Sequence, residues 1–240
     1  SKKEFDNNFF IYSTVHHCWA SPTPCGAVND KWFPAFDYYR ASARKVADKL
    51  KSLFNDNRED FSAKWEDIKV VIEYGMLTEE KFFEKAESFY LYPNVDGDFF
   101  TYEELKEKCG PMQTDKDGKL IYLYASDKDA QHSYIEGAKA KGYEVLLLNS
   151  PIVGHLLQKF EGSKENISFV RVDSDSIDNL IKKEDNTPSK LSEDQKTALK
   201  ERLETVIPKS TYTVQMESLD SSSSPFMITE PEFMRRMKEM

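Results

Sequence analysis

The sequence predicts a mixed fold, α/β and α+β, in which a helical bundle precedes a small α/β layer and the start of an α+β domain. Residues 43–89 place apolar side chains at steps of three and four, which is typical of packed helices. Residues 119–151 form a complete strand, helix and strand pattern. Beyond a polar stretch at 182–190, a further helical pattern and an alternating pattern follow.

Length, charge and cysteine content narrow the class of protein. The chain has 240 residues, a formal net charge of −9 and a pI near 5.1, which argues against binding nucleic acid without regard to sequence. It contains neither an apolar run of about 18 residues nor the apolar core of a signal peptide, so we expect no membrane span. Its three cysteines form no disulfide framework. A soluble, cytoplasmic protein is expected.

The segment 1–38 has aromatic residues without helical or strand periodicity, and we interpret it as an unassigned N-terminal arm that is not needed for the fold. Its His16, His17, Cys18 and Cys25 are potential zinc ligands. However, adjacent histidines are poorly placed for one tetrahedral site, and no second ligand pair follows at finger spacing. We therefore predict no metal site.

Three helices are predicted to form a helical subdomain over 39–112. The apolar positions of the first are Ala43, Val46, Ala47, Leu50, Leu53 and Phe54. Those of the second, which Gly75 is expected to end, are Phe61, Trp65, Ile68 and Ile72. Those of the third, with Thr78 as its N-cap, are Phe82, Phe83, Ala86 and Phe89. Such a stripe could line a ligand groove, but packing in a core is the better interpretation.

Two short acidic segments with glycine are interpreted as turns. Residues 94–98 offer carboxylates for calcium, yet Phe99 and Phe100 stand where further oxygen ligands would be needed, so a turn between extended pieces is favoured. Residues 115–118 form a similar turn. Between the two turns, Thr101 and Glu104 form a capping box for a helix expected to end near Gly110 and Pro111.

An α/β subdomain is predicted over 113–186. Residues 120–125 and 144–149 are apolar runs typical of buried strands, and the helix between them is expected to begin at Ser126 and to stop at Gly142. A right-handed crossover makes the two strands parallel. The alternation over 168–173 predicts a third strand in the same sheet.

The remainder, 187–240, is interpreted as the truncated start of a C-terminal domain that follows the polar linker 182–190. Ser192 and Gln195 form a second capping box for a helix with Leu199, Leu203 and Val206 on one face. Residues 212–219 alternate as a strand, and a serine-rich loop follows. Thr229 and Glu232 are expected to cap a final helix.

Motifs of common enzymes are missing from the sequence. It has no glycine-rich phosphate loop, no Gly-x-Ser-x-Gly elbow and no His-Glu-x-x-His. His132, beside Asp127 or Asp129, and His155 are possible general acids or bases, although a lone helix histidine is more often a surface residue. A small α/β enzyme with a ligand site at the carboxyl ends of strands 120–125 and 144–149 is the alternative hypothesis.

Several blocks of the sequence resemble the middle segment of the Hsp90 family of chaperones, and most of all its bacterial HtpG members. The blocks are KVADKLKSLFNDNREDFSAKWEDIKVVIEYGMLTEEKFFEKA, KLIYLY, YIEGAKAKGYEVLLL and FVRVDSD, within 44–178. A weaker likeness continues through PFMITEPEFMRRMKEM. The resemblance implies a fragment of an ATP-dependent, homodimeric, stress-related chaperone that binds partly folded client proteins.

The resemblance also bears on cofactors and on a binding site. The family's ATP-binding domain and the Ser-Arg loop with its catalytic arginine have no counterpart in this sequence, so we expect that the fragment is not an enzyme, binds no cofactor, and leaves ATP and magnesium to the full-length family. The family carries a client-contacting amphipathic helix at the position of Phe233, Met237 and Met240, with Met234 beside them. These four residues are the predicted client-binding site, and burial against further C-terminal elements is the alternative.

Overall fold

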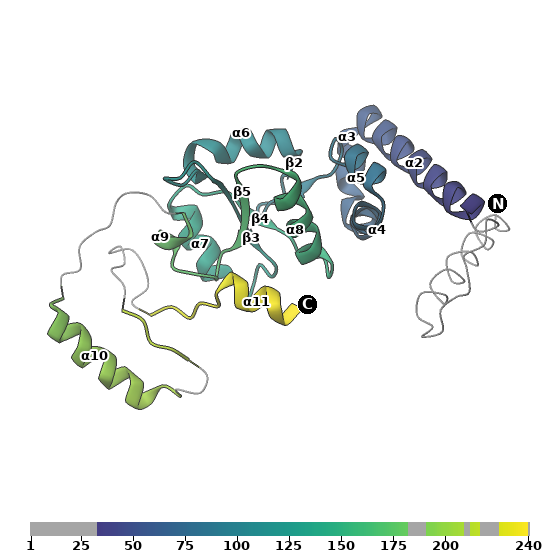
Figure 1. Ribbon diagram of the computed structural model, residues 1–240. Coiled ribbons are helices and arrows are strands. Elements are labelled where there is room, and N and C mark those ends of the chain that lie inside the picture. The colour runs from purple at the N-terminus through teal and green to yellow at the C-terminus, as the bar shows by residue number, and fades with distance from the viewer. Residues whose placement is uncertain (1–32, 182–190, 209–211, 217–225, 240) are drawn as a thin grey trace, which may run out of the picture.

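The computed structural model describes residues 33–181, 191–208, 212–216 and 226–239, and Figure 1 shows their arrangement. Most of the predicted arm, the predicted linker and the serine-rich loop therefore lie outside the described residues. The last part of the predicted arm is helical, because the first described helix begins at Phe33. No helix within the described ranges is long and apolar enough to cross a bilayer.

The first part of the fold is helical, as the apolar spacing predicts, but it has four helices where three were predicted: α2 (Phe33–Asp56), α3 (Arg58–Ala63), α4 (Trp65–Thr78) and α5 (Glu80–Ala86). The break between α3 and α4 was not predicted. The apolar residues predicted on the second and third helices are buried or pack against the buried cluster. On α2 the prediction is too broad, since Val46 and Leu53 are 49% and 44% exposed.

Two predicted helix boundaries in this part are wrong. Gly75 lies inside α4, where an added Cβ would come within 2.9 Å of the Phe82 ring, so glycine permits the close approach of α5. Thr78 is the last residue of α4 and donates its hydroxyl hydrogen to the Tyr74 carbonyl at 2.8 Å. α5 begins after Glu79 instead. At Gly75, packing between helices overrides the local stop signal.

A short hairpin and a helix connect the two parts. Strands β1 (Tyr92–Pro93) and β2 (Phe99–Phe100) are antiparallel, and Gly97 takes a φ of 93° in the turn between them. Helix α6 (Tyr102–Gln113) has the predicted capping box but runs past Gly110 and Pro111. The predicted turn at 115–118 is confirmed, with a φ of 79° at Gly118.

The second part is a three-stranded parallel sheet with helices packed on it, which confirms the predicted βαβ unit and its third strand. Along the chain lie β3 (Leu120–Ala125), α7 (His132–Ala140), β4 (Val145–Leu147), α8 (Val153–Ser163) and β5 (Ile167–Arg171). The strand order is β4-β3-β5, so β3 is central. Gly142 has the predicted left-handed conformation, with a φ of 76°.

The start of α7 and the whole of α8 differ from the sequence-based expectation. Ser126 does not cap α7, because the loop after β3 is held by Gln131, whose side-chain oxygen accepts hydrogen bonds from the backbone N–H groups of Ser126 at 2.8 Å and Asp127 at 3.1 Å. Helix α8 was not predicted. It buries Leu156, Leu157 and Phe160.

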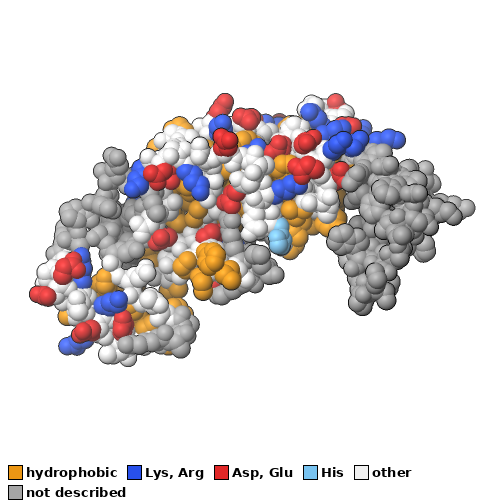
Figure 2. Space-filling model, viewed as in Figure 1, with side chains coloured by type: hydrophobic (Ala, Val, Ile, Leu, Met, Phe, Trp, Pro, Cys, Tyr) orange, Lys and Arg blue, Asp and Glu red, His pale blue; other side chains and the backbone are white. Residues whose placement is uncertain are grey.

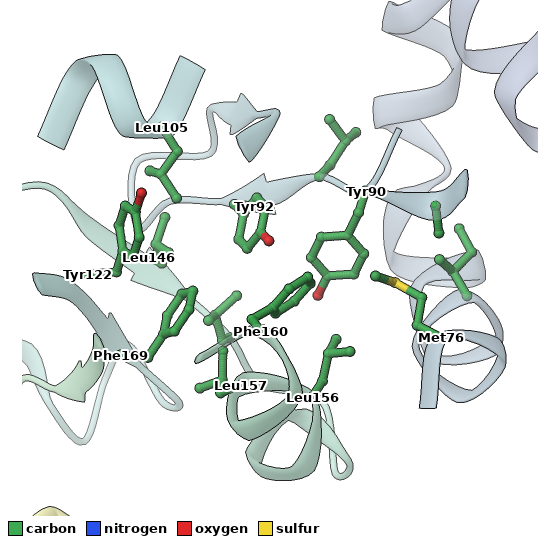
Figure 3. Packing of buried hydrophobic residues seen from close by; sticks show 14 of the residues in the cluster. Met76, Tyr90, Tyr92, Leu105, Tyr122, Leu146, Leu156, Leu157, Phe160 and Phe169 are labelled. Atoms are coloured by element: carbon green, nitrogen blue, oxygen red, sulfur yellow. The ribbon is translucent and has the colours of Figure 1, made fainter. Parts of the chain in front are cut away.

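One aromatic core joins the helices to the sheet. Figure 3 shows the Phe160 ring close to those of Tyr90, Tyr92 and Phe169. The ring centroids of Tyr90 and Tyr92 lie 4.9 Å apart, and Phe160 is 5.5 Å and 5.6 Å from them. The predicted aromatic stripes belong to the same buried cluster, since it includes Phe61, Trp65, Phe82, Phe83 and Phe89.

The last segments contradict the sequence-based expectation at two places. After α9 (Ile177–Leu180), helix α10 (Glu193–Val206) carries the predicted capping box, and all of its side chains keep some exposure. Residues 212–216, the described part of the predicted strand, form no strand. Helix α11 (Glu232–Glu239) begins too late for Thr229 to be its N-cap.

Candidate functional site

Helix α11 docks at the carboxyl edge of the parallel sheet, where Figure 1 shows it beside the strands. Arg235 is only 5% exposed, and its guanidinium donates hydrogen bonds to the Tyr124 hydroxyl and to Glu232. It also lies over the Tyr124 ring, with 5.6 Å between Cζ and the ring centroid. Tyr124 is next to last in β3. The side chain through which α11 is buried against the sheet is therefore the charged Arg235.

Glu232 is the second charged residue in this contact. Its carboxylate accepts a hydrogen bond from the Tyr124 hydroxyl at 3.2 Å and one from the Arg171 backbone N–H at 3.4 Å. Tyr124 thus donates to Glu232 and accepts from Arg235, so one hydroxyl links both charged partners. Buried charges are tolerated when they are paired and hydrogen-bonded in this way.

The segment before α11 is also held by polar groups. The Tyr134 hydroxyl donates to the Ile228 carbonyl at 2.5 Å, and the Glu230 N–H donates to the Asp173 carbonyl at 3.1 Å. Arg171 pairs with Asp173 at 2.6 Å and with Glu230 at 3.5 Å. Burial and the nearby Asp173 charge raise the pKa of Tyr134.

The apolar side chains of α11 point the other way. Phe233, Met234 and Met237 are 71%, 53% and 60% exposed, while Met240 lies outside the described residues. In the preceding segment Phe226 and Ile228 are 69% and 67% exposed. Figure 2 shows hydrophobic side chains gathered in this part of the molecule, at the lower middle of the view. Three of the four predicted client-binding residues therefore form an exposed apolar face, called the α11 face below.

A hollow of about 290 Å³ lies between α11 and the sheet edge. It is lined by Tyr124 near the end of β3 and Ser126 just after it, by residues 148–151 after β4, by the first turn of α8 with His155, and by Arg235. Of the two histidines considered as general acids or bases, only His155 is among these lining residues, and both are exposed. The described residues hold no cluster of three His, Cys, Asp or Glu side chains that could bind a metal.

Polar side chains of α4 support the loop that forms one wall of this hollow. The Lys69 ammonium donates to the Asn149 side chain at 2.5 Å, although the two residues are far apart in sequence. Nearby, the buried Glu73 accepts a hydrogen bond from the Tyr90 hydroxyl at 2.9 Å. Burial raises the pKa of Glu73, and hydrogen bonds from Ser150 and Tyr90 oppose that rise. Helix α4 of the first part therefore supports one wall of the hollow without lining it.

Comparison with known proteins shows which proteins the chain is similar to. No protein-family profile matches the chain. However, it is 42% identical over 200 residues to the chaperone protein HtpG of Porphyromonas gingivalis, and 47% identical over 204 residues to HtpG of Bacteroides thetaiotaomicron. Each match covers 82% of this chain. The chain is similar to a segment of the HtpG chaperones. The resemblance seen in the sequence is thereby confirmed, and the comparison supports the chaperone hypothesis and not the enzyme alternative.

The chain corresponds to one segment of these HtpG proteins, since it spans 29% of the length of the relatives from P. gingivalis and B. thetaiotaomicron. A solved structure, the middle domain of a putative heat shock protein of Plasmodium falciparum, is similar to 61% of this chain over 60% of its own, with a TM-score of 0.45 and 18% identity. A likeness of that size supports no conclusion about function.

Sequence reasoning found the apolar residues of α11 but missed the polar residues that dock it. Glu232 and Arg235 stand three residues apart, a spacing that indicates a pair on one helix face. Nothing local marks Tyr124 or Arg171 as their partners, because these residues lie on strands far away in the sequence. The docking contact exists only in the folded chain.

Proposed function

We propose that the chain is a segment of an ATP-dependent HtpG chaperone and that it binds partly folded client proteins through the α11 face. The observation that carries the proposal is the reversed orientation of α11, whose charged residue is buried and whose large apolar residues are exposed. Amphipathic helices usually bury their apolar stripe. An exposed stripe with neighbouring exposed apolar residues is typical of a surface that binds another protein.

The chemistry of the α11 face suits varied partners. Phe233 provides a large apolar surface, and Met234 and Met237 provide flexible, polarizable side chains that adapt to different shapes. Met240 extends the same side of the helix in the sequence pattern. In the proposal these four residues contact apolar segments that an incompletely folded client exposes.

The remaining properties of the whole chaperone are part of the same proposal. ATP and magnesium act in parts of the full-length protein that this chain does not match, so the segment itself is not an enzyme and holds no cofactor. The full-length protein is a cytoplasmic homodimer. Within the chain, the proposed divisions are 39–112 and 113–186 for two parts of a middle domain and 187–240 for the start of a C-terminal domain.

The test replaces two residues of the α11 face by charge, Phe233→Glu with Met237→Glu, and measures suppression of the thermal aggregation of a model client. We expect suppression to be lost while the unfolding midpoint is unchanged, because both side chains are largely exposed. The matched control is Val71→Glu on α4, since Val71 is 70% exposed but lies on a different helix.

The result separates client binding from simple packing. Loss of suppression in the double variant but not in Val71→Glu supports the proposal. Equal suppression by the double variant and the parent contradicts it. A large fall in the unfolding midpoint would show that the α11 face stabilises the chain instead.

A further inference from the structure

We propose that Tyr124, Glu232 and Arg235 are positioning residues that hold α11 with its apolar face toward solvent and thereby set the affinity for clients. This inference rests on the proposed function. It goes beyond it by assigning a role to three residues that lie beneath the α11 face and need not touch a client.

The first argument is the weakness of α11 by itself. The helix has eight residues, which is too short to be stable alone in water. Its described apolar side chains contribute little to docking, since Phe233, Met234 and Met237 remain largely exposed. The orientation of α11 must therefore come from its polar contacts.

The second argument is the arrangement of those contacts around one hydroxyl. The Tyr124 hydroxyl accepts from Arg235 and donates to Glu232 at 3.2 Å, and the two charged residues also pair with each other. Removing one member leaves the others buried without full compensation. The three side chains therefore favour a single position and orientation of α11 on the sheet.

The third argument links the orientation of α11 to the affinity for clients. A helix that is already held in its binding orientation loses less conformational freedom when a partner arrives. Without the polar contact, α11 can fray or turn its apolar side toward the adjacent hollow, whose lining includes Leu148 and Val153. In either case the α11 face is presented for a smaller fraction of the time, and the apparent affinity falls by that fraction.

The test is Tyr124→Phe, which keeps the ring under Arg235 but removes the shared hydroxyl. The control is Tyr122→Phe, because Tyr122 lies two residues earlier in the same buried strand and so on the same face of the sheet. Binding is measured by fluorescence anisotropy with labelled, reduced and carboxymethylated α-lactalbumin, a permanently unfolded protein. We expect the dissociation constant to rise about tenfold in Tyr124→Phe, on the scale of hydrogen bonds to charged groups, and to stay within about twofold in Tyr122→Phe.

A second measurement separates positioning from general stability. Hydrogen exchange of the backbone amides of α11 is expected to speed up in Tyr124→Phe, while exchange in β3 and β5 stays as in the parent. If Tyr124→Phe lowers the unfolding midpoint, Glu232→Gln takes its place, since it keeps the shape and an acceptor for Tyr124 but removes the charge facing Arg235. The same changes in affinity and exchange are then expected.

Two failures can be told apart. If Tyr124→Phe and Glu232→Gln bind the unfolded protein as the parent does, while Phe233→Glu with Met237→Glu abolishes binding, the positioning role is wrong and the proposed function stands. If the double glutamate variant binds normally, the α11 face is not the client site, and the positioning role falls with it.

Discussion

Two contacts in this protein differ in the kind of side chain that makes them. The helical part is joined to the sheet by apolar side chains, whereas α11 is attached to the sheet by polar ones. At the joint, Phe160 of α8 packs among Tyr90, Tyr92 and Phe83, with ring centroids 5.5 to 5.6 Å away. At α11, the contact is made by a buried arginine, a carboxylate and a tyrosine hydroxyl. Apolar surface is buried between the helices and the sheet, whereas the apolar side chains of α11 stay exposed.

The difference shows how a protein can keep apolar side chains available without losing order. Burial of apolar surface is the main stabilising contribution in folding, so a helix attached by its apolar stripe cannot also offer that stripe to a partner. Attachment through Arg235 and Glu232 leaves Phe233 and Met237 free for binding. The cost is that the docking depends on a few polar groups.

The largest expected effect tests the apolar joint. Phe160→Ala should lower the free energy of unfolding by about 3–5 kcal/mol, because Phe160 is 1% exposed and its loss leaves a cavity between the two parts. Urea unfolding followed by tryptophan fluorescence measures the change, since Trp65 lies in the same cluster. The comparison partner is Phe233→Ala on the exposed face, for which a change within about 0.5 kcal/mol is expected. Equal losses from the two variants would show that α11 is also held by apolar burial.

A second prediction concerns how tightly α4 and α5 approach each other. Gly75→Ala should destabilise the chain by about 1–3 kcal/mol, because the new Cβ would lie 2.9 Å from the buried Phe82 ring. Gly137→Ala in α7 is the control, since no atom outside its own helix backbone lies within 4 Å of the added Cβ. There the usual helix preference for alanine should stabilise by about 0.5–1 kcal/mol. Opposite signs for the two variants in thermal unfolding would confirm the close contact, and stabilisation by both would disprove it.

The smallest expected effect tests a polar contact that is exposed, unlike that of Arg235. Arg58 makes a paired hydrogen bond with Glu104 at 2.5 and 2.6 Å, and their side chains are 41% and 42% exposed. The hydrogen bond from Arg58 lowers the pKa of Glu104 to about 2. Because solvent screens the pair, Arg58→Ala should cost only about 0.5–1 kcal/mol at pH 7.

The pH dependence of this pair has a definite sign. A carboxyl with a lowered pKa in the folded state stabilises the protein above its unfolded pKa of about 4.3, and this contribution is lost as the pH falls toward about 2. The stability difference between Arg58→Ala and the parent should therefore shrink between these two values in acid titrations of the unfolding midpoint. A difference that stays constant would mean that Arg58 acts through packing on Phe54 and not through charge. The Arg58 Cζ atom lies 5.7 Å from the centroid of the Phe54 ring.

Much of the local structure was determined by the sequence, because short-range signals were consistent with the final fold. The capping boxes at Thr101 and Ser192 start α6 and α10, and Gly97, Gly118 and Gly142 take the left-handed conformations that their turns require. The three parallel strands followed from apolar runs and from the geometry of a βαβ crossover. The apolar spacing of Phe233 and Met237 likewise placed the residues of the α11 face on one side of a helix.

Tertiary structure alone decided where those elements begin and which side they present. Gly75 stays inside α4 because Phe82 packs on it, and α7 starts at His132 because Gln131 folds back on the loop after β3. The outward orientation of the α11 face depends on Tyr124 and Arg171, which lie on strands far from α11 in sequence. Helical periodicity fixes which residues share a face, but the direction of that face is set by the partners that the fold brings to it, and in this chain those partners bind the charged side.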